Sequence, residues 1–219
     1  MPDRRSWPAK RLVLFDLDGV LLDSRENMQR SWQRVCEQFK TAVSFDRYFS
    51  EIGRPFPAIM GRLGLSERAA EIEAVFRMAS MDNLDALRFY PDVSETLRAL
   101  QEAGLKLGIV TSKDLLRTNA ILAMLPVNFA CVHAPDGKMR GKPAPDHLLM
   151  AMAQAGSDPA ETVYIGDMAA DHEAARRAGI DYAHADWGYG RRPGDGSWIL
   201  ASMRDLLELT SMQSGREAS

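Results

Sequence analysis

Two aspartates separated by a single residue follow the first apolar segment of the chain. Asp16 and Asp18 stand in FDLDGVLLDS, directly after the run RLVLF at residues 11–15. Side chains two positions apart in a strand project to the same side, so both carboxylates can meet at its carboxyl end. Adjacent carboxylates repel each other unless a cation or a shared proton lies between them, and Mg²⁺ favours carboxylates together with water and phosphate oxygens. In isolation the same pair is also typical of a surface turn.

Hydroxyl and ammonium groups in two later segments could bind a phosphate. Thr111, Ser112 and Lys113 follow the apolar run LKLGIV. A hydroxyl with neighbouring backbone N–H groups can donate to phosphate oxygens. Lys142 stands in GKPAPD, where two prolines would stiffen the loop that carries its ammonium group. Each feature alone also has a structural explanation, as a helix cap or as a solvated turn.

Two more aspartates follow another apolar run. TVYIG leads into Asp167, and Asp171 stands four residues further on, where it could also serve as a helix cap. The carboxyl ends of parallel strands lie at one edge of a sheet, and ligands of open α/β sheets bind there. Because all these groups follow successive strand-like runs, the sequence predicts one site that binds a dianion through a metal ion.

Apolar runs and helical repeats alternate along the second half of the chain. Five runs are predicted as strands, at residues 11–15, 105–110, 129–134, 162–166 and, more weakly, 180–185. The spacing of apolar residues predicts helices at residues 91–103, 114–125, 147–155 and 169–178. Continuous apolar strands indicate burial on both faces. The pattern therefore predicts an α/β fold, a parallel sheet with helices on both faces.

The interval from Ser24 to Phe89 differs from the rest of the chain. It has apolar residues at helical spacing and no convincing strand. About 65 residues between two strands exceed an ordinary crossover, so the segment is predicted to be an inserted all-helical subdomain. Residues expected to fill that subdomain's own core are Trp32, Met60 and Phe76. The predicted organisation is a core of residues 1–22 and 90–210, a helical subdomain of residues 23–89, and a disordered tail of residues 211–219.

The composition is that of an ordinary folded protein. The chain has 219 residues, of which 46% are hydrophobic and 26% charged, and its net charge is −3. This balance excludes wholesale disorder and offers no electrostatic reason to bind nucleic acid or an anionic membrane. No apolar run approaches the roughly 18 residues of a membrane span, and the N-terminus has no signal-peptide core. Cys36 and Cys131 form no metal or disulfide motif, which, together with the missing signal-peptide core, predicts a cytoplasmic location. The expected oligomeric state is a monomer or a homodimer.

The motifs, taken in order, resemble those of one enzyme superfamily. FDLDGVLLDS, IVTSK, GKPAPD and IGDMAADHEAARRAG are similar to the four signature motifs of the haloacid dehalogenase-like (HAD) hydrolases, in their phosphoglycolate phosphatase-like branch. The resemblance extends from about Lys10 to Gly190, and the combination of motifs is highly specific. It implies a Rossmann-like, doubly wound core, and the helical insertion between the first two motifs resembles the small C1-type helical cap of that branch.

The resemblance implies a role in phosphoryl transfer for both residues of the two-aspartate motif. Asp16 matches the nucleophile that forms an aspartyl-phosphate. Asp18 matches the general acid and base, and its backbone carbonyl would also ligate Mg²⁺. The dehalogenase branch carries a different residue at the position of Asp18 and needs no metal. Asp18 therefore favours phosphoryl transfer over cleavage of carbon–halogen or carbon–phosphorus bonds.

The resemblance also implies ligands for the phosphate and for the metal. Thr111 matches the phosphate-binding hydroxyl, with the N–H group of Ser112 beside it. Lys142 matches the residue that neutralises phosphate and nucleophile. Asp167 matches a metal ligand, and Asp171 matches a ligand or its hydrogen-bonding partner. The expected metal ligands are therefore Asp16, Asp18, Asp167 and Asp171.

Residues beside the motifs and in the cap are expected to contact the rest of the substrate. Gly19 permits a tight turn next to the site, and Lys113 follows the phosphate-binding hydroxyl, so both are expected to touch substrate. Arg54 in EIGRPF lies at about the position of the family's specificity loop, although it could equally be a surface residue. Trp187 and Tyr189 in HADWGYGRRPGDG could rim the opening or pack internally.

The predicted function is hydrolysis of a small phosphomonoester by a Mg²⁺-dependent phosphatase that forms an aspartyl-phosphate. A cap that closes over the site favours small soluble substrates, such as a phosphoglycolate-like compound, a sugar phosphate or a related metabolite, over phosphoproteins. Two alternatives stay open. A phosphosugar mutase of the same superfamily would use the same aspartates but return the phosphoryl group to the sugar. A non-catalytic binding or regulatory protein on this fold would have lost a motif residue, and none is lost here.

Overall fold

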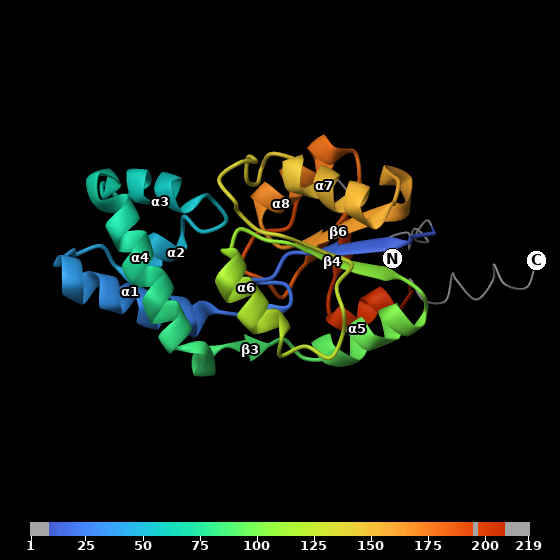
Figure 1. Cartoon of the computed structure of the whole chain (residues 1–219), viewed down its shortest axis with the longest axis horizontal. Helices are drawn as coiled ribbons and strands as arrows, with labels where there is room; N and C mark the ends of the chain where they lie inside the picture. Colours follow the sequence, from blue (N-terminus) through green and yellow to red (C-terminus); the bar gives the residue numbers. More distant parts are fainter. Residues whose placement is uncertain (1–8, 195–196, 209–219) are drawn as a thin grey trace, which may run out of the picture.

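The computed structural model describes residues 9–194 and 197–208. It consists of an α/β core and a block of helices that stands at one end of the core (Figure 1). The predicted tail of residues 211–219 lies outside the described residues. None of the described helices has both the length and the apolar character that crossing a membrane requires.

The core is built on a six-stranded sheet in which neighbouring strands run parallel, in the order β5-β4-β1-β6-β7-β8. The strands are β1 Leu12–Phe15, β4 Lys106–Val110, β5 Cys131–His133, β6 Thr162–Gly166, β7 Asp181–Ala185 and β8 Trp198–Leu200. The five predicted strands are confirmed, and β8 is an additional edge strand. Its three residues form too short a run for hydrophobic periodicity to reveal.

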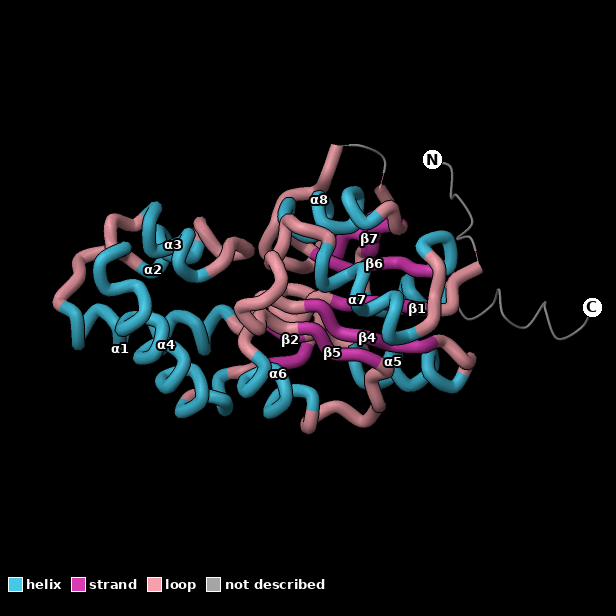
Figure 2. The backbone as a smooth tube through the Cα atoms, turned by 45° about the horizontal axis from the view of Figure 1, so that its top comes forward, coloured by secondary structure: helices cyan, strands magenta, loops and turns pink. Residues whose placement is uncertain are grey.

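Helices cover both faces of this sheet, as predicted. They are α5 Val93–Glu102, α6 Leu115–Leu122, α7 Asp146–Ala155 and α8 Ala169–Ala178, with the 3-10 turns η3 Pro159–Glu161 and η4 Met203–Leu207. Along β1, Leu12 and Leu14 pack with α7 and α8, which Figure 2 shows near each other against the sheet. Val13 and Phe15 pack with α5, α6 and η4 on the other face. Because both sets of alternating side chains are buried, β1 is apolar throughout.

The register of the sheet brings the ends of three strands to one level. Phe15 of β1 lies opposite Ile109 of β4 and Ile165 of β6. The backbone N–H group of Asp16 continues this pattern and donates to the Ile165 carbonyl at 2.9 Å. Residues that follow β1, β4 and β6 therefore emerge side by side at the carboxyl edge of the sheet.

The insertion folds around a core of its own. Its elements are α1 Arg25–Phe39, α2 Phe45–Phe49, α3 Phe56–Arg62, η1 Ser66–Arg68, α4 Ala69–Asp82 and η2 Leu84–Ala86. Trp32 of α1 stacks on Tyr48 of α2 with ring centroids 4.4 Å apart, and Met60 and Phe76 are buried in the same cluster. The inserted helical subdomain is thus confirmed, and we propose the limits of residues 23–89 for it.

A two-stranded ribbon joins the helical block to the core. β2 (Leu22–Asp23) pairs antiparallel with β3 (Arg88–Phe89), where the chain leaves the core and returns to it. The expectation of no strand between Ser24 and Phe89 is wrong at this point, because a strand of two residues leaves no period in the sequence. The ribbon places the two connections next to each other.

Candidate active site

The ends of β1 and β6 bring three buried carboxylates together. One oxygen each of Asp16, Asp167 and Asp171 lies within 4.8 Å of the other two. Asp171 reaches the cluster from the first turn of α8, and its Oδ2 accepts the backbone N–H groups of Asp167 and Met168 at 3.3 and 2.9 Å. The structure therefore brings together three of the four aspartates that the sequence analysis assigned to a metal.

The oxygens of this acidic cluster fit a divalent cation. Asp167 Oδ1 is buried and has no hydrogen-bond donor among the described residues, whereas Oδ2 accepts the N–H group of Tyr189 at 2.7 Å. Burial, and then the neighbouring Asp171 and Asp16, raise the pKa of Asp167 well above its usual value. A buried carboxylate among like charges needs a cation or a proton to compensate it. Oxygen ligands of this kind suit Mg²⁺ and similar hard ions.

Lys142 supplies a fixed positive charge beside the acidic cluster. Its Nζ lies 3.0 Å from Asp16 Oδ1 and donates to Asp171 Oδ1 at 2.6 Å and to the Tyr164 hydroxyl at 3.1 Å. Burial works against the ammonium form, but Asp16 and Asp171 outweigh it and raise the pKa of Lys142. Burial also works against the charged form of Asp16, and it raises the pKa of this carboxyl group to about 7, although Lys142 acts to lower it. Lys142 is therefore a permanent cation, while Asp16 depends on added positive charge to ionise fully.

Asp18 faces the helical block rather than the acidic cluster. Its Oδ1 accepts a hydrogen bond from Ser24 Oγ at 2.5 Å and lies 3.1 Å from Lys113 Nζ. Burial lowers the pKa of Lys113, and Asp18 acts in the opposite direction. Thr111 is buried nearby, where its Oγ1 accepts the backbone N–H of Lys113 at 3.1 Å. The Asp18 side chain thus stands apart from the three clustered carboxylates. Of the two Asp18 groups that were expected to contact the metal, only the backbone carbonyl stays a candidate ligand.

Gly19 lets the turn after β1 pass directly against Asp167. Its φ is +84°, and a β-carbon at this position would lie 2.3 Å from Asp167 Oδ2. A side chain here would therefore displace a carboxylate of the acidic cluster as well as strain the backbone.

We expect Gly19→Ala to weaken metal binding about tenfold to a hundredfold, because the added methyl group would move Asp167. Binding is measured from the rise in melting temperature when Mg²⁺ is added to metal-free protein. Gly104→Ala is the matched control, since Gly104 has a φ of +83° and no atom within 4 Å of the added carbon. Both variants share the backbone strain, so equal responses to Mg²⁺ would contradict the prediction.

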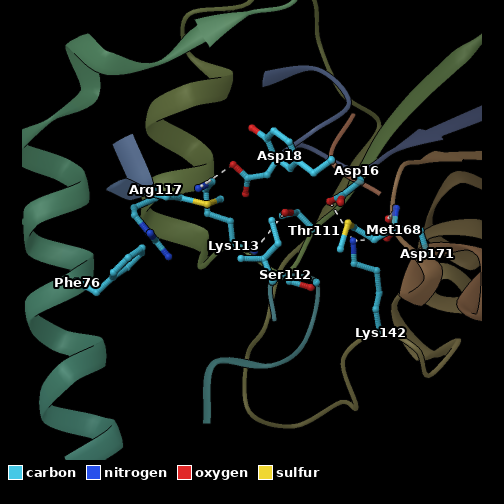
Figure 3. A pocket seen from close by; sticks show the side chains of 14 residues that line it. Asp16, Asp18, Phe76, Thr111, Ser112, Lys113, Arg117, Lys142, Met168 and Asp171 are labelled. Atoms are coloured by element: carbon cyan, nitrogen blue, oxygen red, sulfur yellow. Dashed lines mark hydrogen bonds and ion pairs between the residues drawn. The ribbon is translucent and has the colours of Figure 1, made fainter. Parts of the chain in front are cut away.

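Most of these residues line one pocket between the core and the helical block (Figure 3). Asp167 and Gly19, the latter expected to touch substrate, are not among the residues that line it. Its volume is about 100 Å³. The predicted site residues that line it are Asp16, Asp18, Thr111, Ser112, Lys113, Lys142 and Asp171. The helical block contributes Met28, Ile52, Gly53 and Phe76. Phe76 was expected only in the core of the helical block, and it belongs to both that core and the pocket wall.

Arg54 is not among the residues that line this pocket. Its Nε lies 3.3 Å from buried Glu51, which Arg47 and Arg62 also contact at 2.9 and 2.5 Å. Arg54 also borders a neighbouring cleft of about 420 Å³ against the start of α8. In this arrangement of the two parts, the Arg54 side chain is directed to Glu51 instead of to the predicted substrate position.

The loop after β7 ties the core to the helical block. The Tyr189 hydroxyl donates to Asp23 Oδ1 at 2.9 Å and accepts the N–H group of Ser24 at 2.8 Å. The Tyr189 ring meets Phe49 of α2 edge-on, with centroids 5.1 Å apart. Of the two aromatic residues singled out in this loop, Tyr189 lines the pocket and Trp187 packs against the hydrophobic core.

Arg117 is a pocket residue that the sequence analysis missed. It lines the pocket from the first turn of α6. A signal for its position was present in the sequence, because Asp114 is the N-cap of α6 and its Oδ1 accepts the N–H group of Arg117 at 3.1 Å. An N-cap aspartate places the residue three positions later in the first turn of its helix. Because the N-cap of α6 directly follows the segment Thr111–Lys113, this first turn lies next to the predicted phosphate-binding residues.

Known proteins match this chain in sequence and in fold. The sequence profile of the haloacid dehalogenase-like hydrolases matches residues 13–185. The phosphoglycolate phosphatase of Aquifex aeolicus is 30% identical over 183 residues, which cover 82% of this chain and 86% of that protein. Pyrophosphatase PpaX of Halalkalibacterium halodurans is 32% identical over 212 residues, covering 92% and 97%. A haloacid dehalogenase-like hydrolase from Streptococcus pneumoniae has the same fold, with a TM-score of 0.79, 19% identity and coverage of 90% and 97%.

The chain belongs to the haloacid dehalogenase-like hydrolase family. Within that family it falls in the phosphoglycolate phosphatase-like branch, and it is an enzyme of the phosphatase type.

Proposed function

We propose that this protein is a Mg²⁺-dependent phosphatase that hydrolyses a small phosphomonoester through an aspartyl-phosphate on Asp16. The observation that supports this most directly is the position of Asp16, which lines the pocket as a member of the acidic cluster and lies 3.0 Å from Lys142 Nζ. An attacking carboxylate must approach an anionic phosphoryl group, and positive charge beside both screens their repulsion. Similarity to the phosphatase of Aquifex aeolicus supports the same class of reaction.

Asp16 and Asp18 would share the two steps of hydrolysis. In the first step, an Asp16 oxygen bonds to phosphorus while the bond from phosphorus to the alcohol oxygen breaks, and Asp18 gives that oxygen a proton. In the second step, Asp18 takes a proton from water, the water oxygen bonds to phosphorus, and the bond to Asp16 breaks. Ester and water thus become alcohol and phosphate, and two moderate barriers replace one high barrier.

Asp16, Asp167 and Asp171, with the backbone carbonyl of Asp18, would hold the Mg²⁺ ion. When bound, the ion supplies positive charge that orients the phosphoryl group and stabilises the charge on its oxygens. The buried Oδ1 of Asp167, which lacks a hydrogen-bond donor among the described residues, supports this assignment.

Three residues of the core would bind the phosphoryl oxygens. Thr111 offers its hydroxyl and Ser112 its backbone N–H group, and both line the pocket after β4. Lys142 adds an ammonium group whose position is fixed by its contacts with Asp16 and Asp171. Donors that are held in place before the substrate arrives stabilise charge without the cost of reorganisation.

We expect Asp18→Asn to lower kcat about 10²- to 10³-fold, because an amide cannot transfer the proton. The amide has the same shape, so binding of inorganic phosphate should change by less than about tenfold. Asp82→Asn, at an exposed position at the end of α4, serves as the control. Unchanged turnover in Asp18→Asn would remove Asp18 from the mechanism.

Phosphate release from a panel of phosphorylated metabolites, with and without Mg²⁺, tests the proposed function. The Asp16→Asn protein provides the blank. We expect Mg²⁺-dependent release from at least one small ester. No release across the panel would reject the proposal, and an isomerised product formed without release would identify a phosphosugar mutase.

A further inference from the structure

A third cationic side chain of the pocket, in addition to Lys142 and Lys113, stands on the far side from the acidic cluster. Arg117 lines the pocket from α6, and Figure 3 shows it next to Phe76, across from Asp16 and Lys142. Its side chain is 11% exposed, so the charge is largely shielded from water. Asp18 lies between these two ends of the pocket in the same view.

One edge of the Arg117 guanidinium is fixed by its neighbours. Nε donates to Asp114 Oδ2 at 2.5 Å, and Cζ lies 5.8 Å from the centre of the Phe76 ring. Asp114 is itself anchored as the N-cap of α6 and lies 3.6 Å from Nε of Arg77 on α4. The guanidinium is therefore held in place before a ligand arrives, which reduces the entropy lost on binding.

The terminal amino groups of Arg117 have no comparable partner. Within residues 9–194 and 197–208, no acceptor receives a hydrogen bond from Nη1 or Nη2. Lys142 and Lys113 differ, because each contacts a carboxylate that takes part in the proposed reaction. Arg117 is thus free to bind a part of the ligand other than the reacting phosphoryl group.

We propose that Arg117 binds a second anionic group of the substrate, a carboxylate or a phosphate on the part that leaves. This rests on the function proposed above, because Asp18 as proton donor places the leaving oxygen on the Arg117 side of the pocket. A guanidinium presents parallel N–H donors that match two oxygens of a carboxylate or phosphate. The apolar side chains of Met28, Ile52 and Phe76 line the same pocket and strengthen such an ion pair by limiting access of water.

The size of the pocket restricts this class of substrate further. A volume of about 100 Å³ accommodates a phosphoryl group and a short connection to the second charge. The proposed substrate is therefore a compact phosphate compound with a second anionic group, either a phosphorylated small carboxylic acid or a diphosphate, in preference to a phosphorylated neutral sugar.

Matched probes test this assignment. Phosphoglycolate carries a carboxylate where 2-hydroxyethyl phosphate carries a neutral hydroxymethyl group, and pyrophosphate carries a second phosphoryl group. For each anionic probe, we measure the ratio of its kcat/KM to that of the neutral probe. We expect a ratio of at least about 10 for the wild type, and a ratio about ten- to a hundredfold lower for Arg117→Gln, mainly through KM. Arg117→Lys, which keeps the charge without parallel donors, should lie between them.

The control and the probes decide how the result is interpreted. Arg98→Gln removes an exposed arginine of α5 and should leave the ratios unchanged. If only the phosphoglycolate ratio falls in Arg117→Gln, the second group is a carboxylate; if only the pyrophosphate ratio falls, it is a phosphate. Unchanged ratios in Arg117→Gln, or a wild type without preference for either anionic probe, overturn the proposal. Arg117 then serves only to connect α6 with α4.

Binding to a catalytically blocked protein separates this assignment from the proposed reaction. Calorimetry measures the affinities of the same three probes for Asp16→Asn and for Asp16→Asn combined with Arg117→Gln. Weaker binding of an anionic probe to the double variant supports the Arg117 site even if no probe is hydrolysed, an outcome that counts against the proposed function alone. Equal affinities overturn the Arg117 site, and Mg²⁺-dependent hydrolysis of any probe would still support the proposed function.

Discussion

We expect Asp16→Asn to lower phosphate release to the level of a protein-free solution, a loss on the order of 10⁴-fold or more. The amide nitrogen and oxygen of asparagine are poor nucleophiles, so the covalent route through Asp16 is lost rather than slowed. The assay is phosphate release with Mg²⁺. In parallel, mass spectrometry of acid-quenched wild-type protein should locate a phosphoryl group on the peptide that contains Asp16.

The same variant should keep its fold. Burial raises the pKa of Asp16 to about 7, so a neutral amide at this position removes a charge that the metal-free protein accommodates poorly. We therefore expect metal-free Asp16→Asn to melt at the same temperature as the wild type or higher, with the exposed Asp82→Asn as control. Substantial turnover in a folded Asp16→Asn protein, or a phosphoryl group on another residue, would show that Asp16 is not the nucleophile.

Residues at the strand ends of the core could be placed from the sequence. Asp16, Thr111 and Asp167 each follow a continuous apolar run, and parallel strands of a buried sheet end at a common edge. The order of the runs, with a helix between most of them, left few topologies open. This prediction needs only the positions of the apolar runs and the rule that ligands bind at the carboxyl edge of a parallel sheet. It therefore identifies residues that lie close together without knowledge of their side-chain contacts.

Contacts between the core and the helical block could not be placed in this way. Phe76 was expected inside the helical block, and Arg117 was not singled out, yet both line the pocket. Whether Phe76 and Arg117 meet depends on how α4 packs against α6. The spacing of apolar residues within each helix does not determine how the two helices pack. Arg54 shows a related difficulty inside the helical block, because it pairs with Glu51 three residues earlier, which Arg47 and Arg62 also contact. The sequence pattern does not decide between this pairing and a contact with substrate.

The short elements escaped prediction for a different reason. β3 has two residues and β8 has three, whereas a strand needs several alternating positions to be recognised. β2 and β3 nevertheless set where the helical block is attached to the core. Elements stabilised by tertiary pairing rather than by local preference are therefore where this sequence says least about its structure.

We expect Lys142→Met to lower kcat/KM about 10³- to 10⁴-fold, because one ammonium group serves both the nucleophile and the phosphoryl oxygens. Methionine has a similar length and no charge, so the substitution tests charge more than volume. Phosphate release with Mg²⁺ measures the effect. Lys138→Met is the matched control, since Lys138 is an exposed lysine in the same loop. A loss of similar size in the control would place the effect in the loop rather than in the ammonium group.

Lys142→Met should also change how the stability of the metal-free protein depends on pH. The pKa of Asp16 is about 7 in the folded protein, against an ordinary value of 3.8, even though Lys142 lowers it. Between these values the native state binds more protons than the unfolded chain, so stability falls as pH rises. Without Lys142 the pKa of Asp16 in the native state rises further, and the fall in stability extends to higher pH.

Urea denaturation in EDTA at about pH 6 and about pH 8 measures this change. The free energy of unfolding should fall more between these two pH values in Lys142→Met than in Lys138→Met, by roughly 1.4 kcal/mol for each unit by which the pKa of Asp16 rises within this pH range. Equal losses in the two variants would show that Lys142 does not control the ionisation of this carboxyl group.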